Sequence, residues 1–364
     1  MEDRKIRIFY LIGSSEIGGT EKMLFSLIEN LDKRKFQVSV IGIKGEGKFT
    51  EELRKRKIKL YVFNLKKNLF SFFNLLKLLK KEKPDILHSF LFAGNITGRI
   101  TGKLAGIKIV ISSQRSEDKW RKWYHWMIDR ITAGWTDLII SNSFAGKKVL
   151  IEKGKISPEK IKVIPNGIEI PSLSSKKEKK NLVVGTVGNL RKVKGHIYLI
   201  KAAIEILKDF PEVKFVVIGE GELKNFLMEE IKKAGIEKNF IFTGFVPEPM
   251  KYVREFDVFV LTSLWEGCPV SLLEAMSMGV VPVAFGVGDV PYIIKDGEEG
   301  FVVEPCNYKE LARKIKKLLL DEKLRKEMGE KAKMKIKREF TIEKMIKSSE
   351  ETYFSLLDRK KRER

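Results

Sequence analysis

The sequence predicts an α/β protein made of two doubly wound, Rossmann-like domains. Two observations predict this class. Apolar runs of strand length alternate with helical patterns along the 364-residue chain, and such alternation is typical of parallel sheets with helices on both faces. The alternation pauses at a polar, non-periodic segment over residues 171–180 and then starts again. The length suits two domains or one large one, with ample chain for a core.

The first half of the chain carries the first series of alternating strands and helices. Strands are expected over residues 5–12, 36–43, 60–63, 85–90, 109–113 and 137–141. Helices are expected in the intervals, ending at residue 31, over 49–56, over 69–81, ending at 105, over 119–132, and starting at 143. Each strand pattern is a short apolar run bounded by turn residues.

A glycine-rich loop over residues 13–21 joins the first predicted strand to its helix. Gly18 and Gly19 permit a close approach of the backbone to a ligand, which is how doubly wound sheets cradle phosphates. Glycines in such a turn also serve the fold alone. The residues leave a phosphate site and a structural turn as alternatives.

The helix predicted over residues 69–81 is rich in phenylalanine and lysine. Phe72, Leu75, Leu76 and Leu79 form a helical apolar stripe. A basic, aromatic amphipathic helix can lie on an anionic membrane surface. A helix between two strands can also pack on the sheet, and packing is the expectation here.

Polar residues close two predicted strands of the first half. His88 lies near the end of the strand over residues 85–90, and Arg115 follows the strand over 109–113. Parallel sheets gather ligand groups at this edge. His88 either faces a ligand or is a hydrogen-bonded interior histidine. Arg115 either serves an anionic acceptor or pairs with Glu117 or Asp118.

The second half repeats the alternation. Strands are expected over residues 181–187, 213–218, 240–245, 256–262 and 280–285, with a helix that ends at residue 209. Turn signals over 286–291 and 296–300 frame a short helix and a hairpin. The remaining sequence is helical and charged. Residues 341–357 are expected to pack across the first domain, and residues 360–364 form a frayed basic tail.

Two basic residues lie in the loop after the first strand of the second half. In the stretch over residues 188–196, Arg191 and Lys194 precede a predicted helix. A forked guanidinium and a compact ammonium can together neutralise a diphosphate. Basic residues in loops are also commonly just solvated, so the loop by itself leaves both alternatives open.

Two glutamates flank the start of the helix between the strands over 256–262 and 280–285. Glu266 lies in the loop, Pro269 suits the first helical turn, Glu274 follows in the early turns, and Gly279 closes the helix. A carboxylate can accept hydrogen bonds from two neighbouring sugar hydroxyls. The alternative is that Glu266 caps the helix and Glu274 is a solvated helix residue.

The composition limits the classes of partner. The chain has 71 Lys plus Arg against 48 Asp plus Glu, a formal charge of +23, which attracts polyanions or an anionic membrane surface. A solvated Lys/Glu-rich surface is the third alternative. The basic residues are spread along the chain and rarely alternate with aromatic residues, so a nucleic-acid partner is not expected.

The same composition bears on location. Cys268 and Cys306 are the two cysteines and give no disulfide framework. Neither a secretory signal pattern nor a membrane-spanning apolar run is apparent. A cytoplasmic protein is expected, with peripheral binding to the inner face of the membrane as an open alternative.

Four ordered motifs together resemble the retaining glycosyltransferases of family four. They are Gly18-Gly19 with Glu21, the stretch 164–168, the loop from Arg191 to Gly195, and the pair Glu266 and Glu274, which seven residues separate. The resemblance covers nearly the whole chain. It implies the GT-B architecture, in which two domains face each other across a central cleft that holds the donor.

The resemblance also implies a division of the chain. Residues 1–165 would form the acceptor-side domain, 166–181 the linker and 182–340 the nucleotide-sugar-binding domain. Residues 341–364 would supply a C-terminal helix that packs back on the first domain, and a basic tail.

The activity implied is transfer of a hexosyl group from a nucleotide-diphosphate sugar, a UDP-sugar before GDP-mannose. The acceptor would be a saccharide or a lipid-linked saccharide in cell-envelope or polysaccharide synthesis. Arg191 and Lys194 would stabilise the leaving diphosphate, Glu266 would hold the hexose, and Glu274 would bind the ribose. The donor-binding residues implied are Gly18, Gly19, Arg191, Lys194, Glu266, Gly267, Cys268, Pro269 and Glu274.

Arg191, Lys194 and Glu266 form the implied catalytic set, and His88 and Arg115 lie on the acceptor side. No cofactor is implied. No Asp-x-Asp motif appears, so transfer without a metal ion is expected. The sequence departs from the family at two positions. Many relatives have a histidine near Arg115 and an arginine where Asn189 stands, and Arg191 would supply the latter contact.

Two other functions are compatible with parts of the sequence. A nucleotide-sugar epimerase shares the two-domain plan, but it would release sugar without an acceptor. A non-catalytic protein that binds polyanions or a membrane surface through charge would show steep salt dependence and no stabilisation by nucleotides.

Overall fold

The structure is a computed structural model that describes residues 4–68, 70–171 and 181–363. The chain divides into two compact units. Unit 1 comprises Met1–Gly167 and Ile342–Arg364, and unit 2 comprises Ile168–Thr341. Leu69 of the helix predicted over 69–81, and residues 172–180 of the predicted linker, lie outside the described residues. The cleft between the two domains stays a prediction.

Unit 1 is built on a seven-stranded sheet in the order β3-β2-β1-β4-β5-β6-β7. All neighbouring strands are parallel. The strands are β1 (Ile6–Ile12), β2 (Phe36–Gly42), β3 (Lys59–Val62), β4 (Ile86–Phe90), β5 (Ile109–Gln114), β6 (Leu138–Ser141) and β7 (Ile161–Val163). The six strands predicted for this half are confirmed. β7 was not predicted, because three residues are too few to show a period of two.

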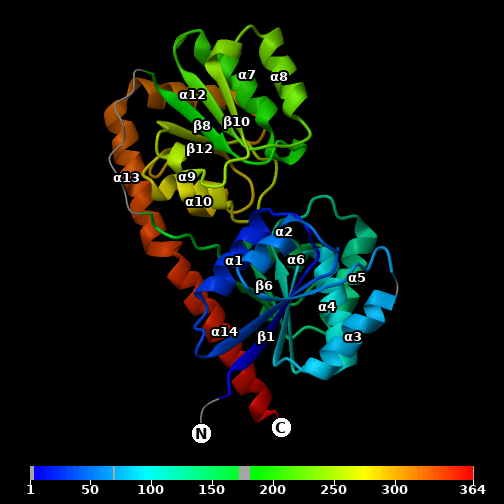
Figure 1. Cartoon of the computed structure of the whole chain (residues 1–364). Coiled ribbons are helices and arrows are strands. Elements are labelled where there is room, and N and C mark those ends of the chain that lie inside the picture. The colour runs from blue at the N-terminus through cyan, green and yellow to red at the C-terminus, as the bar shows by residue number, and fades with distance from the viewer. Residues whose placement is uncertain (1–3, 69, 172–180, 364) are drawn as a thin grey trace. The chain divides into compact units, whose positions relative to one another are not determined.

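Helices connect these strands, and the C-terminal helix joins them. They are α1 (Gly19–Asn30), α2 (Lys48–Lys55), α3 (Phe70–Glu82), α4 (Phe92–Ala105), α5 (Trp123–Ala133), α6 (Phe144–Glu152) and α14 (Ile342–Arg362). α14 lies against α1 within unit 1 (Figure 1). The prediction of a frayed tail over residues 360–364 is wrong for most of the segment. The helix continues through Arg362, and the Lys360 ammonium lies 3.0 Å from the Asp137 carboxylate.

The helix α3 packs as a connecting helix. Leu75 and Leu79 are fully buried and join the apolar cluster beneath the sheet. Phe70 and Phe73 remain exposed. Leu75 and Leu79 of the predicted stripe therefore pack on the sheet, as expected for a connecting helix.

Unit 2 contains a six-stranded parallel sheet in the order β10-β9-β8-β11-β12-β13. The strands are β8 (Val183–Val187), β9 (Lys214–Ile218), β10 (Phe240–Gly244), β11 (Val258–Leu261), β12 (Val281–Phe285) and β13 (Phe301–Val303). The prediction of a hairpin near residues 296–300 is wrong. β13 pairs with β12 in parallel, since the short helix α11 (Val290–Ile293) first carries the chain back to the starting edge.

Helices cover both faces of the sheet of unit 2. They are α7 (His196–Leu207), α8 (Lys224–Lys233), α9 (Met250–Val253), α10 (Val270–Ser277), α11, α12 (Tyr308–Leu320) and α13 (Glu322–Glu339). Side chains of α7, α8 and α12 share one apolar cluster with Val258 and Val260. Side chains of α9, α10, α11 and α13 share the other with Phe259 and Leu261. Alternate residues of β11 thus fill opposite layers, which explains why its sequence is apolar throughout.

Candidate active site

The candidate site lies in unit 2, where the loops that follow β8 and β11 meet. These strands are neighbours in the sheet, but β8 is followed in sequence by β9 on its other side. The chain order therefore reverses between β8 and β11. Open parallel sheets bind ligands at this switch point, beyond the carboxyl ends of the strands.

Two glycines let the loops approach closely. A Cβ atom on Gly219 would lie 2.1 Å from the carbonyl oxygen of Gly188, and one on Gly195 would lie 2.2 Å from that of Thr262. Gly195 also has φ +61°, which disfavours any residue with a side chain. Both positions require glycine for packing: Gly195 brings the loop after β8 against the loop after β11, and Gly219 brings the loop after β9 against the loop after β8.

Hydrogen bonds fix the two loops to each other. The Leu264 amide donates to the Val193 carbonyl oxygen at 2.8 Å. The Thr262 hydroxyl donates to the Lys194 carbonyl oxygen at 3.0 Å. Lys194 ends a short 3-10 turn over Lys192–Lys194, so these contacts hold its backbone on both sides.

The contact at the centre of the site joins Lys194 and Glu266. The Lys194 ammonium lies 2.5 Å from Oε1 of Glu266, and the two side chains are only 26% and 13% exposed. This pair brings together a cation and a carboxylate that are 72 residues apart. A diphosphate would compete for the ammonium, and sugar hydroxyls for the carboxylate, since both bind through charge-assisted hydrogen bonds.

A third loop, after β12, supports Glu266. Gly288 has φ +56°, and a Cβ atom there would lie 2.6 Å from the Glu266 carbonyl oxygen. The Asp289 amide donates to the Gly267 carbonyl oxygen at 2.9 Å. Sequence reasoning treated this loop as structural, although residues 286–291 resemble a loop near the donor in the family. Its Gly-x-Gly-Asp turn directly after a strand was the signal that it reaches the site edge.

The other predicted donor residues occupy the same loops. Arg191 is exposed at the start of the 3-10 turn. Gly267 and Cys268 are buried, and Pro269 is the N-cap of α10, one residue before the first turn in which it was predicted. Glu274 lies in the second turn of α10 and is half-buried.

Sequence reasoning missed two buried polar groups, one at the end of the loop after β8 and one in the loop after β11. His196 begins α7 and is 4% exposed, and its Nδ1 has no hydrogen-bond partner among the described residues. Burial, followed by the Lys194 charge, lowers the pKa of His196 to about 4. The Ser263 hydroxyl is likewise buried and unpartnered within the described parts of the chain. A lone buried His or Ser carries no sequence signal that separates it from core packing.

The glycines of the first loop lie in unit 1. Gly18 is the N-cap of α1, and its amide donates to the buried carboxylate of Glu21 at 2.9 Å. A Cβ atom on Gly19 would meet no atom within 4 Å. Packing therefore does not require glycine at position 19, which leaves space for a ligand there.

His88 is an interior residue of unit 1. It is 2% exposed, and its Nδ1 and Nε2 lie 3.0 Å from the Tyr353 hydroxyl and 2.8 Å from the Ser113 hydroxyl. Burial, followed by the Arg115 charge, lowers the pKa of His88 to about 3. These contacts favour the interior alternative for His88.

Arg115 has a partner besides the two acids that were considered. Its guanidinium donates to Oδ1 of Asn166 at 2.5 Å. Asp118 pairs with Arg121 at 2.6 Å, and Glu117 lies 3.4 Å from Lys119. Arg115 and His88 line one small cavity of unit 1, so the structure brings the two predicted acceptor-side residues together. Across residues 4–68, 70–171 and 181–363, no group of three or more His, Cys, Asp or Glu could hold a metal ion.

Two family descriptions match successive parts of the chain. "Glycosyltransferase Family 4" matches residues 17–170, and "Glycosyl transferases group 1" matches residues 170–335.

Characterised relatives match over nearly the full length. The UDP-Gal:alpha-D-GlcNAc-diphosphoundecaprenol alpha-1,3-galactosyltransferase of Escherichia coli is 27% identical over 97% of this chain and 98% of its own. A Campylobacter jejuni alpha-1,4-N-acetyl-D-galactosaminyltransferase that acts on GalNAc-alpha-(1->4)-GalNAc-alpha-(1->3)-diNAcBac-PP-undecaprenol is 28% identical over 91% of this chain and 94% of its own.

The fold also matches solved structures. HepE of Anabaena in complex with UDP superposes with a TM-score of 0.86 at 21% identity, over 96% of this chain and 100% of its own. Sucrose-phosphate synthase from Thermosynechococcus elongatus superposes with a TM-score of 0.81 at 16% identity, over 97% and 100% of the two chains. At these identities the likeness establishes the fold, two Rossmann-like domains of the GT-B type.

Proposed function

Because the chain belongs to the glycosyltransferases of the GT-B fold, we propose that it is a retaining hexosyltransferase with a nucleotide-diphosphate sugar as donor and a lipid-linked saccharide as acceptor. The observation that carries this proposal is the contact between Lys194 and Glu266 at the switch point of unit 2. It provides a cation for the diphosphate and a carboxylate for the sugar within one site.

On the donor side, Lys194 and the exposed Arg191 bind the diphosphate. Their charges oppose the negative charge that develops on the leaving group, and this electrostatic effect is strongest where water is excluded. Glu266 accepts hydrogen bonds from hexose hydroxyls, with the amides of Gly267 and Cys268 beside it. Glu274 accepts from the ribose hydroxyls. The open space at Gly19 admits a phosphate oxygen near its backbone amide.

A UDP-sugar is the first donor to test, with GDP-mannose second. The Escherichia coli relative is named for UDP-Gal, and solved forms of HepE contain UDP and UDP-glucose. These names support a uridine nucleotide.

The transfer proceeds on one face of the sugar. The bond between the anomeric carbon and the diphosphate oxygen breaks, the acceptor oxygen bonds to the same carbon, and the acceptor proton passes to the leaving phosphate. No protein nucleophile is assigned. The relatives named above form α linkages, and UDP-hexoses are α-linked, so an α product would retain configuration. We propose that no metal ion or other cofactor takes part.

The acceptor proposal rests on the relatives. Both of those named above act on saccharides linked through diphosphate to undecaprenol. A lipid-linked acceptor places the reaction at a membrane surface, and we propose peripheral binding there. Arg115, which lies with His88 on a small cavity of unit 1, is the candidate contact for an anionic acceptor group. No helix in the described ranges has the length and apolarity to cross a bilayer.

The test is a transfer assay with undecaprenyl-diphosphate-linked saccharides and a panel of UDP- and GDP-sugars, with and without EDTA. Sugar should reach the lipid-linked acceptor, and EDTA should leave the rate unchanged. An epimerase would instead release or interconvert sugar without acceptor. A protein that binds polyanions through charge alone would show no shift of melting temperature with uridine, guanosine or adenosine diphosphates.

A further inference from the structure

A stripe of large apolar side chains on and beside α5 points away from the core of unit 1. Trp123 is 74% exposed and Ile131 is 61% exposed. The members within α5 recur three or four residues apart, so they lie along one side of the helix, and Trp120 and Trp135 flank its two ends. We call this stripe the α5 face; its exposed members are Trp120, Trp123, Tyr124, Met127, Ile128, Ile131 and Trp135.

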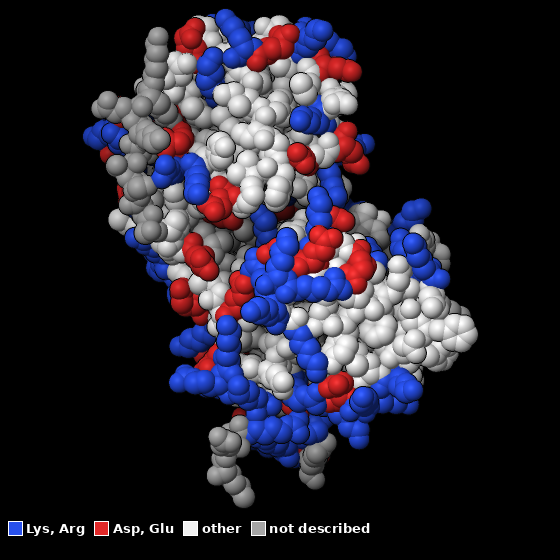
Figure 2. Space-filling view, in the orientation of Figure 1, with Lys and Arg blue, Asp and Glu red and all other residues white. Residues whose placement is uncertain are grey.

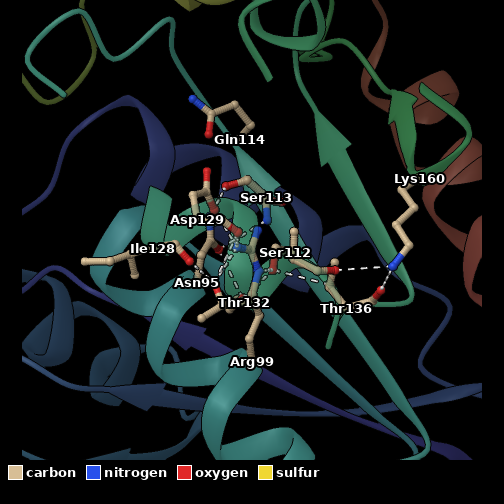
Figure 3. Close-up of polar contacts among 12 residues, drawn as sticks. Asn95, Arg99, Ser112, Ser113, Gln114, Ile128, Asp129, Thr132, Thr136 and Lys160 are labelled. Carbon is tan, nitrogen blue, oxygen red and sulfur yellow. Dashed lines mark hydrogen bonds and ion pairs between the residues drawn. The ribbon is translucent and has the colours of Figure 1, made fainter. Parts of the chain in front are cut away.

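The inner side of α5 is fixed by a buried polar network (Figure 3). Asp129 forms ion pairs with Arg99 and with Arg121, the latter at 2.8 Å, and Arg99 is 1% exposed. Arg99 also donates to the Ser112 hydroxyl at 2.9 Å and the Thr132 hydroxyl at 3.1 Å. Ile128 points away from this network in the close-up.

This arrangement departs from the usual pattern of a packed helix, because α5 is apolar on its outer side as well as in part of its inner side. An apolar stripe of helical period normally marks the side that faces the core. Here the core side carries Trp126 and Ala133, which pack in an apolar cluster, together with Asp129. Rotating α5 to bury the stripe would break the buried ion pairs of Asp129. The outward position of the α5 face is therefore built into the fold, and large exposed apolar patches mark interaction sites.

Most charges around the α5 face are basic, and the two acids just before it, Glu117 and Asp118, pair with Lys119 and Arg121. Lys119, Lys122 and Arg130 are exposed. The one acidic residue in the segment 119–135 is Asp129, which is buried in the network. Figure 2 shows a broad uncharged area over α3, α4 and α5 of unit 1, with mostly basic and a few acidic residues along its edges. Trp and Tyr beside aliphatic residues, bordered by Lys and Arg, suit the interface of an anionic bilayer.

We propose that the α5 face inserts into the headgroup region of an anionic lipid bilayer and holds unit 1 at the membrane. The partner is a lipid surface rather than a second copy of this chain. A symmetric dimer through the same face would bring Lys122 and Arg130 of both copies into one interface, and like charges would oppose it. This proposal rests on the proposed function, which supplies the lipid-linked acceptor. It adds the surface of unit 1 that contacts the membrane.

The test is co-sedimentation of the full-length protein with phosphatidylglycerol/phosphatidylcholine vesicles and with pure phosphatidylcholine vesicles. The variant Trp123→Ala/Ile131→Ala should bind the anionic vesicles at least about tenfold more weakly, since both side chains contribute buried apolar area. Lys122→Gln/Arg130→Gln should weaken binding mainly at low salt. The matched control is Phe226→Ala/Met228→Ala, two exposed apolar residues of α8, which should bind as the parent does.

Tryptophan fluorescence gives a second readout. Four of the five tryptophans, Trp120, Trp123, Trp126 and Trp135, lie in or beside α5. Vesicles with brominated acyl chains should therefore quench the emission of the parent protein. Unchanged vesicle binding by Trp123→Ala/Ile131→Ala would overturn the proposal. The proposal would also be overturned if the parent protein did not bind vesicles and instead formed a dimer that this variant abolishes.

The two proposals fail separately. Vesicle binding that depends on the α5 face, without sugar transfer to any acceptor, would contradict the proposed function and leave the docking surface standing. Transfer to a lipid-linked acceptor in detergent, without vesicle binding, would contradict the docking surface alone.

Discussion

Replacing Lys194 by Ala separates a catalytic role from a structural one. The substitution removes an ammonium 2.5 Å from Glu266 in a partly exposed pair. A pair at this exposure contributes about 1 kcal/mol to stability, which corresponds to a fall of roughly 2–4 °C in the melting temperature of a unit of this size. Loss of one preorganised group that stabilises charge in the transition state costs about 3–4 kcal/mol, so turnover should fall by about 100- to 1,000-fold.

The assay is UDP release in single turnover at saturating donor, beside a thermal melt of the same sample. Lys194→Arg is the matched control, because it keeps the charge and should retain more turnover than the alanine variant. Glu266→Gln tests the partner and should weaken donor binding through the sugar. A fall in turnover of less than about fivefold for Lys194→Ala would refute the reasoning. A loss that merely follows the unfolded fraction would refute it as well.

Three further predictions concern glycine and histidine positions. Gly195→Ala should destabilise unit 2 by about 2 kcal/mol and lower its melting temperature by about 4–8 °C, because φ is +61° and the methyl group would meet the Thr262 carbonyl; an unchanged melt would contradict the close approach. Gly19→Ala should keep the melting temperature within about 2 °C yet reduce turnover at least tenfold if a phosphate occupies that space, and normal turnover would remove Gly19 from the donor site. His88 has a pKa of about 3 when folded and an ordinary value of 6.5 when unfolded, so the unfolded state binds more protons between these values. The free energy of unfolding should therefore fall as pH drops below about 6.5, by up to about 1.4 kcal/mol per pH unit. Urea titrations at pH 7, 6 and 5 measure the free energy of unfolding. If this free energy fell equally steeply with pH in His88→Asn, the pKa assigned to His88 would be refuted.

The alternation of apolar runs predicted most of the strands because each central strand is buried on both faces. β11 and β12 are examples, in which every residue is buried and the run is apolar throughout. β7 is short, and β13 depends on a parallel return through α11. Neither of these carries a local pattern, so both were missed or misassigned.

The pairing of Lys194 with Glu266 could be anticipated only in part. Each residue follows a predicted strand at the ligand-binding edge. The family resemblance assigned both to the donor, Lys194 to its diphosphate and Glu266 to its hexose. Their contact depends on β8 and β11 being neighbours, which is a property of strand order. The support from Gly288 and the burial of His196 depend on three-dimensional packing in the same way.

The α5 face shows where periodicity misleads. Sequence reasoning considered the helix over residues 69–81 for a membrane, yet Leu75 and Leu79 of α3 are buried in the core. In α5 the apolar stripe lies outside, because Arg99 and Arg121 hold Asp129 on the inner side. A pattern of hydrophobicity cannot reveal that a carboxylate is compensated by residues from other elements.

The most direct measurement of the central claim is the anomeric configuration of the product, determined by NMR after transfer from a UDP-hexose to an undecaprenyl-diphosphate-linked saccharide. The account predicts an α-linked product from the parent protein and sharply reduced formation of it by Lys194→Ala. A β-linked product, or free sugar formed equally well without acceptor, would contradict it.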